Sequence, residues 1–319
     1  MNVASAQTLE RMLVLRALPA FAGLDDQGLA TVAQHCSERI VASGEVLLGQ
    51  GELMSRTFVV VDGRVRVELD GHVVARSDRR IGVGILGMLA GTDSERSVVA
   101  DARARLLVLE RERLFDVMEE EFGILAHVLR VLAKEIIATY MKLGRDYAAP
   151  ERPRPTPPHL KVQGRELDLV ERILAVRQVP AFGRSSLDSV ARYAKLLGER
   201  RIAAGDVLWR EGEPCHTYLH VVAGVVECSR EGSGSVLTYG APAMPGLFGV
   251  LGGREHRWYT ATAKTDVVAL RVDREVILDM LEDDFEMAAR CLTLSARRLI
   301  RFLEMRDEAG RGSTTGNRG

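Results

Sequence analysis

The sequence is poor in cysteine and contains no long apolar run. Its 319 residues include four cysteines, Cys36, Cys215, Cys228 and Cys291. Their spacing forms no paired motif, which argues against a disulfide framework. The N-terminus has no charged segment followed by an apolar one, and no apolar stretch is long enough to cross a bilayer. We therefore expect a soluble protein of the reducing cytoplasm, with no membrane partner.

The sequence also lacks the motifs of common catalytic sites. It contains no G-x-S-x-G elbow, no H-E-x-x-H pair and no G-x-x-x-x-G-K-[ST] phosphate loop. Its 43 basic and 44 acidic residues leave a formal net charge of −1 at pH 7, so the protein as a whole has no field that attracts nucleic acid or an acidic membrane. These absences predict a protein that is not an enzyme.

The N-terminal part of the chain changes from helical to strand periodicity. Residues 9–18 carry apolar side chains at helical spacing, which stops before Pro19, and residues 25–36 repeat that pattern. From Gly44 the period falls to two, and glycines separate short runs such as TFVVVDGRVRV. A further helical segment runs to about residue 145. The order predicts a small roll of antiparallel strands flanked by helices.

Two Asp-Gly pairs fall between these short strands. Asp62-Gly63 and Asp70-Gly71 both suit the positive φ angles of two-residue turns. We expect each pair to close a β-hairpin.

The same order of signals recurs later in the chain at a constant separation. Five landmarks of the first copy each precede a matching residue of the second copy by the same number of positions. The pairs are Pro19 and Pro180, Gly44 and Gly205, Gly51 and Gly212, Gly63 and Gly224, and Arg96 and Arg257. Five matches at one separation predict an internal duplication.

Composition marks the boundaries between the copies. Residues 147–165 include the run AAPERPRPTPP, which is too polar for a core and favours an extended linker. We therefore expect repeat 1 at 9–146 and repeat 2 at 166–306. Residues 307–319 are rich in Gly, Ser, Thr and Arg without periodicity, and they predict a disordered tail.

Each copy contains a cassette in which a glycine turn and a short apolar segment precede one arginine. The first reads GILGMLAGTDSERSVVA from Gly84, and the second reads GLFGVLGGREHRWYTATA from Gly246. Free backbone N–H groups and one guanidinium near a single point suit a phosphate or another anion. A solvated surface charge remains the alternative for Arg96 and for Arg257, since a guanidinium also pairs with any carboxylate.

The glycine-rich strands and the two cassettes together resemble the cyclic-nucleotide-binding domain family. Its members include catabolite-activator-type regulators and the regulatory subunits of cyclic-AMP-dependent kinase. The clearer match is GDVLWREGEPCHTYLHVVAGVVE from Gly205, which is similar to the strand signature of that family. The resemblance covers nearly the whole chain, twice. It implies an α+β, mainly β fold of two tandem jelly-roll-like β rolls with flanking helices.

The resemblance also implies where a ligand would bind. In the family, the amides after the second cassette glycine and the arginine hold the cyclic phosphate. Carried onto this sequence, the ligand-binding residues would be Gly87, Met88, Leu89, Ala90, Arg96 and Ser97 in repeat 1, and Gly249, Val250, Leu251, Arg257 and Trp258 in repeat 2. Trp258 would either stack on a ligand base or fill the roll. No cofactor is implied beyond a cyclic nucleotide or cyclic dinucleotide ligand.

The chain departs from the family pattern at one cassette position. In the family, a glutamate after the glycine accepts a hydrogen bond from the ribose 2′-hydroxyl, and here Met88 and Val250 stand in its place. Losing a hydrogen bond to a charged acceptor weakens a ligand by roughly ten- to a hundredfold. A duplicated ancestor that already lacked the carboxylate explains both copies most simply. Asp93 or Glu255 would have to replace it.

Two other patterns do not predict sites. Gly82 to Gly87 reads GVGILG, but no buried parallel strand precedes it, so we reject a dinucleotide fingerprint. His216 and His220 in one extended strand would lie about 13 Å apart, too far to share a metal ion with Cys215 and Cys228. We expect no metal.

The helix after repeat 1 carries a heptad-like seam. Its apolar positions, broken by one threonine, are Leu125, Leu129, Leu132, Ile136, Thr139 and Leu143. The spacing suits a coiled coil, and a core helix packed on its own roll is the alternative. In the resembled family this is where catabolite-activator-type subunits dimerise, which implies a homodimer through residues 124–145.

These observations support a non-enzymatic regulatory or sensor protein for signal transduction, with a protein partner. Its ligand would be a cyclic nucleotide or another small phosphate-bearing anion. A ligand-independent scaffold or adaptor built from degenerate rolls is the alternative. A transcription regulator is a third hypothesis, but no helix-turn-helix module follows either roll, so we do not expect nucleic acid binding.

Overall fold

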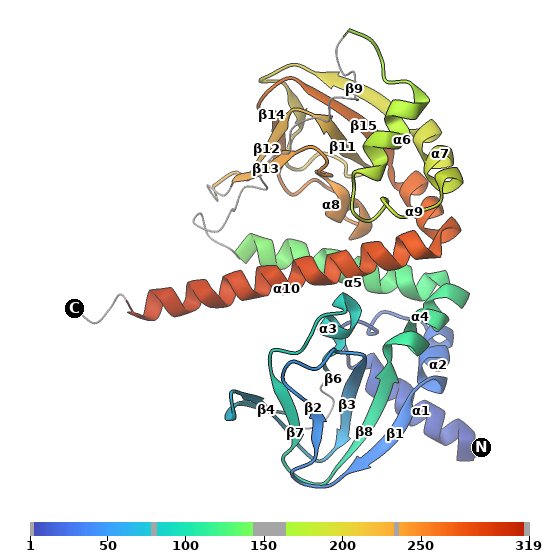
Figure 1. Cartoon of the computed structure of the whole chain (residues 1–319), viewed down its shortest axis with the longest axis vertical. Coiled ribbons are helices and arrows are strands. Elements are labelled where there is room, and N and C mark those ends of the chain that lie inside the picture. The colour runs from blue at the N-terminus through green and yellow to red at the C-terminus, as the bar shows by residue number, and fades with distance from the viewer. Residues whose placement is uncertain (1–2, 78–81, 143–163, 233–235, 316–319) are drawn as a thin grey trace. The chain divides into compact units, whose positions relative to one another are not determined.

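The structure is a computed structural model and describes residues 3–77, 82–142, 164–232 and 236–315. The chain divides into two compact units, each built on an antiparallel β roll with helices beside it (Figure 1). Unit 1 contains Met1–Leu132 and Leu292–Ile300, and unit 2 contains Ala133–Cys291 and Arg301–Gly319. The predicted α+β, mainly β fold with two tandem rolls is confirmed.

Unit 1 starts with two helices, continues through the strands of the first roll and ends with helices. The helices are α1 Val3–Arg16, α2 Asp26–Gln34, α3 Ile85–Ala90, α4 Arg111–Glu120 and the first part of α5 Phe122–Lys142. The strands are β1 Ser37–Val41, β2 Val46–Leu48, β3 Arg56–Asp62, β4 Val65–Leu69, β5 His72–Ser77, β6 Gly82–Val83, β7 Ser97–Ala100 and β8 Ala104–Glu110. They form two antiparallel sheets, β1-β8-β3-β6 and β2-β7-β4-β5, whose facing apolar residues make the roll's core.

The two Asp-Gly pairs of unit 1 have different roles. Asp70 and Gly71 have φ angles of 50° and 79° and join the paired strands β4 and β5, so this hairpin is confirmed. The hairpin predicted at Asp62-Gly63 is wrong, because β3 pairs with β8 while β4 pairs with β7. Gly63 therefore lies at a corner between two sheets, where the backbone of Ala104 comes so close that no side chain fits.

Unit 2 repeats this order. The helices are α6 Leu169–Arg177, α7 Leu187–Leu196, α8 Leu247–Leu251, α9 Arg274–Asp283, the last part of α5 and the two end parts of α10 Phe285–Thr315. The strands are β9 Gly198–Ile202, β10 Val207–Trp209, β11 Thr217–Ala223, β12 Val225–Ser229, β13 Val236–Gly240, β14 Thr260–Ala263 and β15 Val267–Asp273. The sheets are β10-β14-β12-β13 and β11-β15-β9, both antiparallel. Gly224 forms the corner between β11 and β12, in the place that Gly63 has in unit 1.

The helices do not follow the repeat boundaries predicted at 9–146 and 166–306. Ile137 and Tyr140, from the end of α5, lie in the core of the second roll, and Phe302 of α10 packs against the same core. The segment Leu292–Ile300 of α10 belongs to unit 1. Each unit thus includes a helical segment from the other repeat.

Two predicted segments lie partly outside the described residues. Of the linker predicted at 147–165, only residues 164 and 165 are described. The prediction of disorder from Asp307 is wrong as far as Thr315, because α10 continues to that residue. Residues 316–319 lie outside the described part of the chain.

The seam of α5 is covered within the single chain. Its described members Leu125, Leu129, Leu132, Ile136 and Thr139 are all buried, while residue 143 lies outside the described ranges. A homodimer through residues 124–145 stays a prediction, and it would need these side chains to leave their present contacts.

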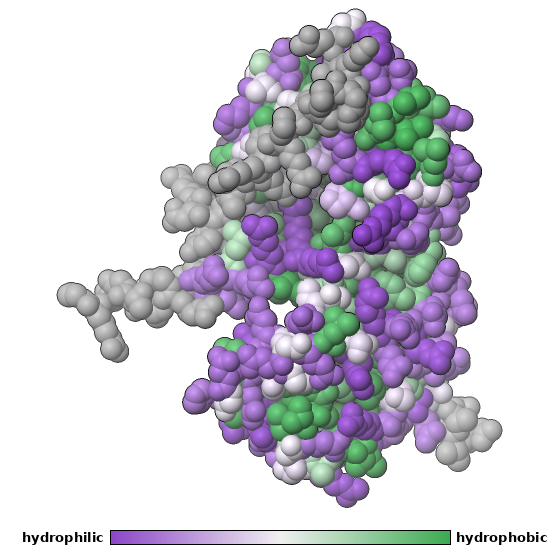
Figure 2. Space-filling view, viewed as in Figure 1, coloured by the Kyte–Doolittle hydropathy of each residue, from purple (hydrophilic) through white to green (hydrophobic). Residues whose placement is uncertain are grey.

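The face of the protein that Figure 2 shows is mostly polar. Figure 2 shows polar side chains over much of the visible face, with an apolar patch over α6, where Leu169, Val170 and Leu174 are exposed. Among the described helices, none combines the length and apolar character needed to cross a bilayer. All four cysteines are buried free thiols.

The second roll should lose stability in mild acid because of one buried histidine. His220 on β11 is 1 % exposed, and burial lowers its pKa from 6.5 to about 4, against a weaker opposing effect of the Ala175 backbone. The unfolded chain therefore binds the proton more tightly, so stability is complete above about pH 6.5 and falls as the pH drops toward 4. The loss should reach about 3 kcal/mol.

Denaturant titrations at several pH values, followed by tryptophan fluorescence, measure this effect, because both tryptophans of the chain, Trp209 and Trp258, belong to unit 2. His220→Leu should flatten the dependence between pH 6.5 and 4 relative to the wild type, since the unfolded chain then lacks the imidazole that cannot be protonated inside the folded roll. Equal slopes for the two proteins would contradict the assignment to His220.

Candidate functional site

Both cassettes form a short helix that starts at a glycine with positive φ. Gly84 precedes α3 with a φ angle of 90°, and Gly246 precedes α8 with a φ angle of 91°. A side chain at either residue would be strained in this left-handed conformation. The predicted order of glycine turn and apolar helix is thus observed in both units.

In repeat 1, a side chain fills the space beside Gly87, the second glycine of the cassette. A methyl group built on Gly87 would overlap the Met54 side chain, which comes from the loop before β3. The cassette residues Met88, Leu89 and Ala90 are at most 1 % exposed. Their side chains are therefore part of the core.

The corner of repeat 2 is filled in the same way. A methyl group built on Gly249 would lie 2.8 Å from Cys215 Sγ, and Cys215 is the residue that matches Met54 at the separation of the duplication. Val250 and Leu251 are also buried. In both units, therefore, a side chain from the same loop occupies the space beside the second cassette glycine.

Arg257 points into the second roll. It is 6 % exposed, and its guanidinium carbon lies 4.1 Å from the centre of the Trp209 ring. Its Nη2 donates to Thr217 Oγ1 at 2.9 Å, and its Nη1 lies 3.7 Å from Cys215 Sγ. Burial lowers the pKa of Arg257, against smaller opposing effects that begin with Cys215. Its Nε has no hydrogen-bond partner among the described residues, so this cation is packed in the core without a carboxylate.

Arg96 does not occupy the same place in the first roll. Its side chain is exposed, and the hydrogen-bond register matches Arg257 to Ser94 instead. The Arg257 carbonyl accepts from Gly212 N at 3.0 Å, and the Ser94 carbonyl accepts from Gly51 N at 2.7 Å. The predicted equivalence of Arg96 and Arg257 is therefore wrong. Ser94 is buried and its hydroxyl donates to the Arg96 carbonyl, so repeat 1 has no cation at this position.

The remaining candidate residues have structural contacts. Ser97 Oγ accepts a hydrogen bond from Gln50 N at 3.0 Å at the start of β7. Asp93 and Glu255, the carboxylates considered as replacements for the missing glutamate, are exposed, and neither forms an ion pair or hydrogen bond with Arg96 or Arg257.

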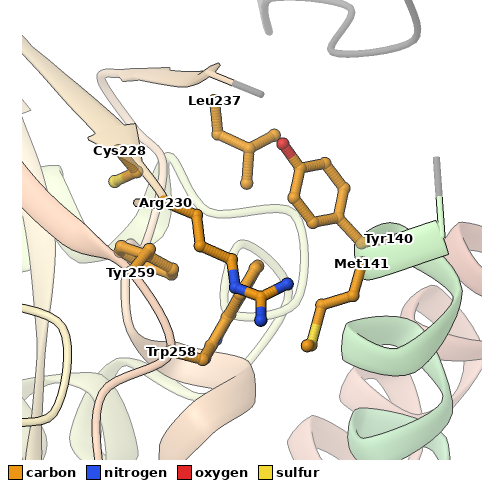
Figure 3. Close-up of a pocket in the computed structure, with 7 residues that line it drawn as sticks. All are labelled: Tyr140, Met141, Cys228, Arg230, Leu237, Trp258 and Tyr259. Atoms are coloured by element: carbon orange, nitrogen blue, oxygen red, sulfur yellow. The ribbon is translucent and has the colours of Figure 1, made fainter. Parts of the chain in front are cut away.

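Aromatic rings fill the second roll beside Arg257. The Trp258 ring lies 4.5 Å from that of Tyr259 and 5.4 Å from that of Tyr140, between ring centres. Figure 3 shows Tyr140 and Met141 of α5 facing Trp258, with Arg230 extending into the space between them. The cavity left there measures about 10 Å³, which is about the space that one water molecule needs. Trp258 thus fills the roll.

Two segments of the sequence, residues 38–121 and 199–284, match the family described as "Cyclic nucleotide-binding domain". Together the matches cover more than half of the chain. The chain belongs to the cyclic nucleotide-binding domain family. The two matched segments coincide with the two rolls, and membership of this family supports a regulatory or sensor role.

The curated relatives of this family member are much longer proteins. The chain is 28% identical over 141 residues to an uncharacterized NTE family protein of Mycobacterium tuberculosis and, equally, to one of Mycobacterium bovis. Each match covers 44% of this chain and 23% of the relative. The chain thus matches less than a quarter of the length of these relatives.

The chain is also similar to solved structures of other proteins. A regulatory subunit of a cAMP-independent protein kinase A from Trypanosoma cruzi, bound to guanosine, is 14% identical, with 88% of this chain and 86% of that chain covered and a TM-score of 0.36. The N-terminal domain of a transcriptional regulator from Streptomyces coelicolor is 26% identical, with 41% and 97% covered and a TM-score of 0.39.

The residues that fill the two cyclic nucleotide-binding corners were not recognised in the sequence. Met54 and Cys215 are both apolar or weakly polar, and they are separated by the same interval as the landmarks of the duplication. Their matching positions in the two copies were the only signal in the sequence. That they lie beside the cassette glycines follows from tertiary packing, which the sequence pattern does not show. No group of three or more potential metal-ligating side chains occurs in the described part of the chain.

Proposed function

We propose that this chain is a non-enzymatic regulatory protein whose two cyclic nucleotide-binding folds act without a cyclic nucleotide, as modules that contact a protein partner. The observation that carries the proposal is the position of Arg257, which is packed against Trp209 and Thr217 inside the roll. A guanidinium held by these two side chains already has its contacts inside the roll.

The first roll supports the same proposal. It has Ser94 where the second roll has Arg257, and its only cassette arginine, Arg96, is exposed. Met54 occupies the space beside Gly87. A cyclic phosphate would find neither a cation nor room at this corner.

A second candidate function is anion sensing in the second roll after a rearrangement. It is favoured by one observation: Arg257 is a buried cation that has no carboxylate partner, and no acceptor for its Nε, among the described residues. Burying an uncompensated charge is costly, and a phosphate that entered the roll would relieve that cost. The aromatic residues Trp258 and Tyr259 would have to move to admit it.

Isothermal titration of the full chain with cyclic AMP, cyclic GMP and a cyclic dinucleotide separates the two candidates. We expect no saturable heat from any of them in protein whose folding is verified by circular dichroism. Arg257→Gln tests the second roll, and Arg96→Gln is the matched control, since Arg96 is exposed. Micromolar binding that Arg257→Gln weakens tenfold or more, and that Arg96→Gln leaves unchanged, would replace the first candidate with the second.

A further inference from the structure

Unit 1 contains a cavity that is separate from the Arg96 side of its cassette. The cavity measures about 560 Å³ and lies at the C-terminal end of α3. Its walls come from the loop before β3, the end of α3, the start of α4, and the turn of α10 around Thr293 and Arg297, all within unit 1. The volume falls within the range of about 300–1,000 Å³ that is typical of small-molecule sites.

Two arginines from distant parts of the sequence face this cavity. Arg111 Nε donates to the Met88 carbonyl at 3.0 Å, and its guanidinium lies 4.1 Å from the centre of the Phe115 ring. Arg297 Nε donates to the Ala90 carbonyl at 2.8 Å. Both guanidinium groups are therefore fixed by the last carbonyls of α3, which leaves their Nη1 groups without an acceptor among the described residues.

Neither of these two charges is paired with a carboxylate. Arg111 is half-buried and Arg297 is exposed, and neither forms an ion pair with a described residue, although Glu110 and Glu112 also line the cavity. Burial lowers the pKa of Arg111, and the charge of Arg297 lowers it further. Two cations that repel each other across a cavity of ligand size favour a guest with two negative charges.

We propose that this cavity binds a phosphomonoester, with its phosphate between Arg111 and Arg297. A phosphate dianion carries the charge that would neutralise both guanidinium groups, and its oxygens match the geometry of their N–H donors. The organic part of the ligand would lie against Leu53 and Met54, apolar side chains that also line the cavity.

Such a ligand would contact residues that support the first cassette. Met54 lines the cavity and also fills the space beside Gly87, and the two arginines hold the end of α3. A phosphomonoester at this site would therefore bias the position of the cassette helix without entering the roll.

Isothermal titration of the full chain with phenyl phosphate and with inorganic phosphate tests the site. The variants are Arg111→Gln and Arg297→Gln, and Arg301→Gln is the matched control, because Arg301 is an exposed arginine on the same helix. We expect saturable binding of phenyl phosphate that each of the first two variants weakens by about ten- to a hundredfold and that the control leaves unchanged. Binding should strengthen as the pH rises through about 6, where the phosphate becomes a dianion.

Several results would overturn the proposal. One is the absence of binding to both probes at millimolar concentration in folded protein. Another is binding that survives both Arg111→Gln and Arg297→Gln, or that Arg257→Gln abolishes, which would place the anion in the second roll. Tighter binding of inorganic phosphate than of phenyl phosphate would contradict the apolar wall. Arg297→Lys keeps the positive charge but loses the paired N–H donors of the guanidinium, so it should bind phenyl phosphate with intermediate affinity. This result would exclude the explanation that Arg297→Gln weakens binding only by disturbing the structure.

Discussion

Replacing Gly224 by alanine should lower the free energy of unfolding of unit 2 by about 3–5 kcal/mol. Gly224 has a φ angle of 88°, which strains any residue with a Cβ atom. Its new methyl group would also overlap the Asp266 carbonyl oxygen and lie 2.9 Å from Val267 Cα. These neighbours are backbone atoms at the start of β15, so they cannot rotate away. Denaturant unfolding followed by the fluorescence of the two tryptophans of unit 2 measures the loss.

Gly205→Ala is the matched control for this prediction. Gly205 has nearly the same φ angle, 92°, but nothing lies within 4 Å of the position of a new Cβ atom. The control should therefore show the backbone strain alone, about 1–2 kcal/mol. Equal losses for the two variants would mean that the corner between the sheets relaxes, and that close approach does not explain the glycine.

The glycine corners and the duplication were predictable because their causes are local. A positive φ angle requires glycine at Gly44, Gly51 and Gly63, and the same requirement places glycine at the matching positions of the second copy. The error at Asp62-Gly63 has a physical reason. A hairpin and a corner between two sheets can both use a glycine with positive φ, here Gly71 and Gly63, so the Asp-Gly pattern does not distinguish them. The partners of β3 and β4 do.

The equivalence of the two cassette arginines failed for a different reason. The separation between matching residues grows by one position from the pair Gly63 and Gly224 to the pair Gly91 and Gly253, and by one more to the pair Ser94 and Arg257. Because of these two insertions, Arg96 and Arg257 keep the sequence separation of the other landmarks without occupying the same place in the fold. Strand register, which depends on pairing with distant residues, decides which side chain enters the roll.

The exchange of helical segments and the Arg111–Arg297 cavity could not be predicted at all. Arg111 and Arg297 belong to different repeats of the sequence, and on sequence grounds Arg297 belongs to the polar face of a C-terminal helix. Only tertiary packing places it at the end of α3. Similarly, heptad spacing in α5 predicts a buried stripe, but it does not specify whether the cover comes from the same repeat, the other repeat or another chain.

Replacing Tyr140 by alanine should lower the free energy of unfolding of unit 2 by about 3–5 kcal/mol. Tyr140 is 8 % exposed, and its ring centre lies 5.4 Å from that of Trp258 and 6.0 Å from that of Phe302. Alanine would leave a cavity between these rings and expose apolar surface of the second roll. Denaturant unfolding followed by tryptophan fluorescence reports on the change directly, because Trp258 is one of the two fluorescent side chains.

Met141→Ala is the matched control, since Met141 is the next residue of α5 and is 39 % exposed. Its effect should stay within about 0.5 kcal/mol, as is usual for surface positions. The comparison decides to which unit the end of α5 belongs. Tyr140 is part of repeat 1 in the sequence, so if its packing served only the first roll, Tyr140→Ala would leave the tryptophan transition of the second roll where it is in the wild type. A shift for Tyr140→Ala alone requires that a helix of the first repeat completes the core of the second.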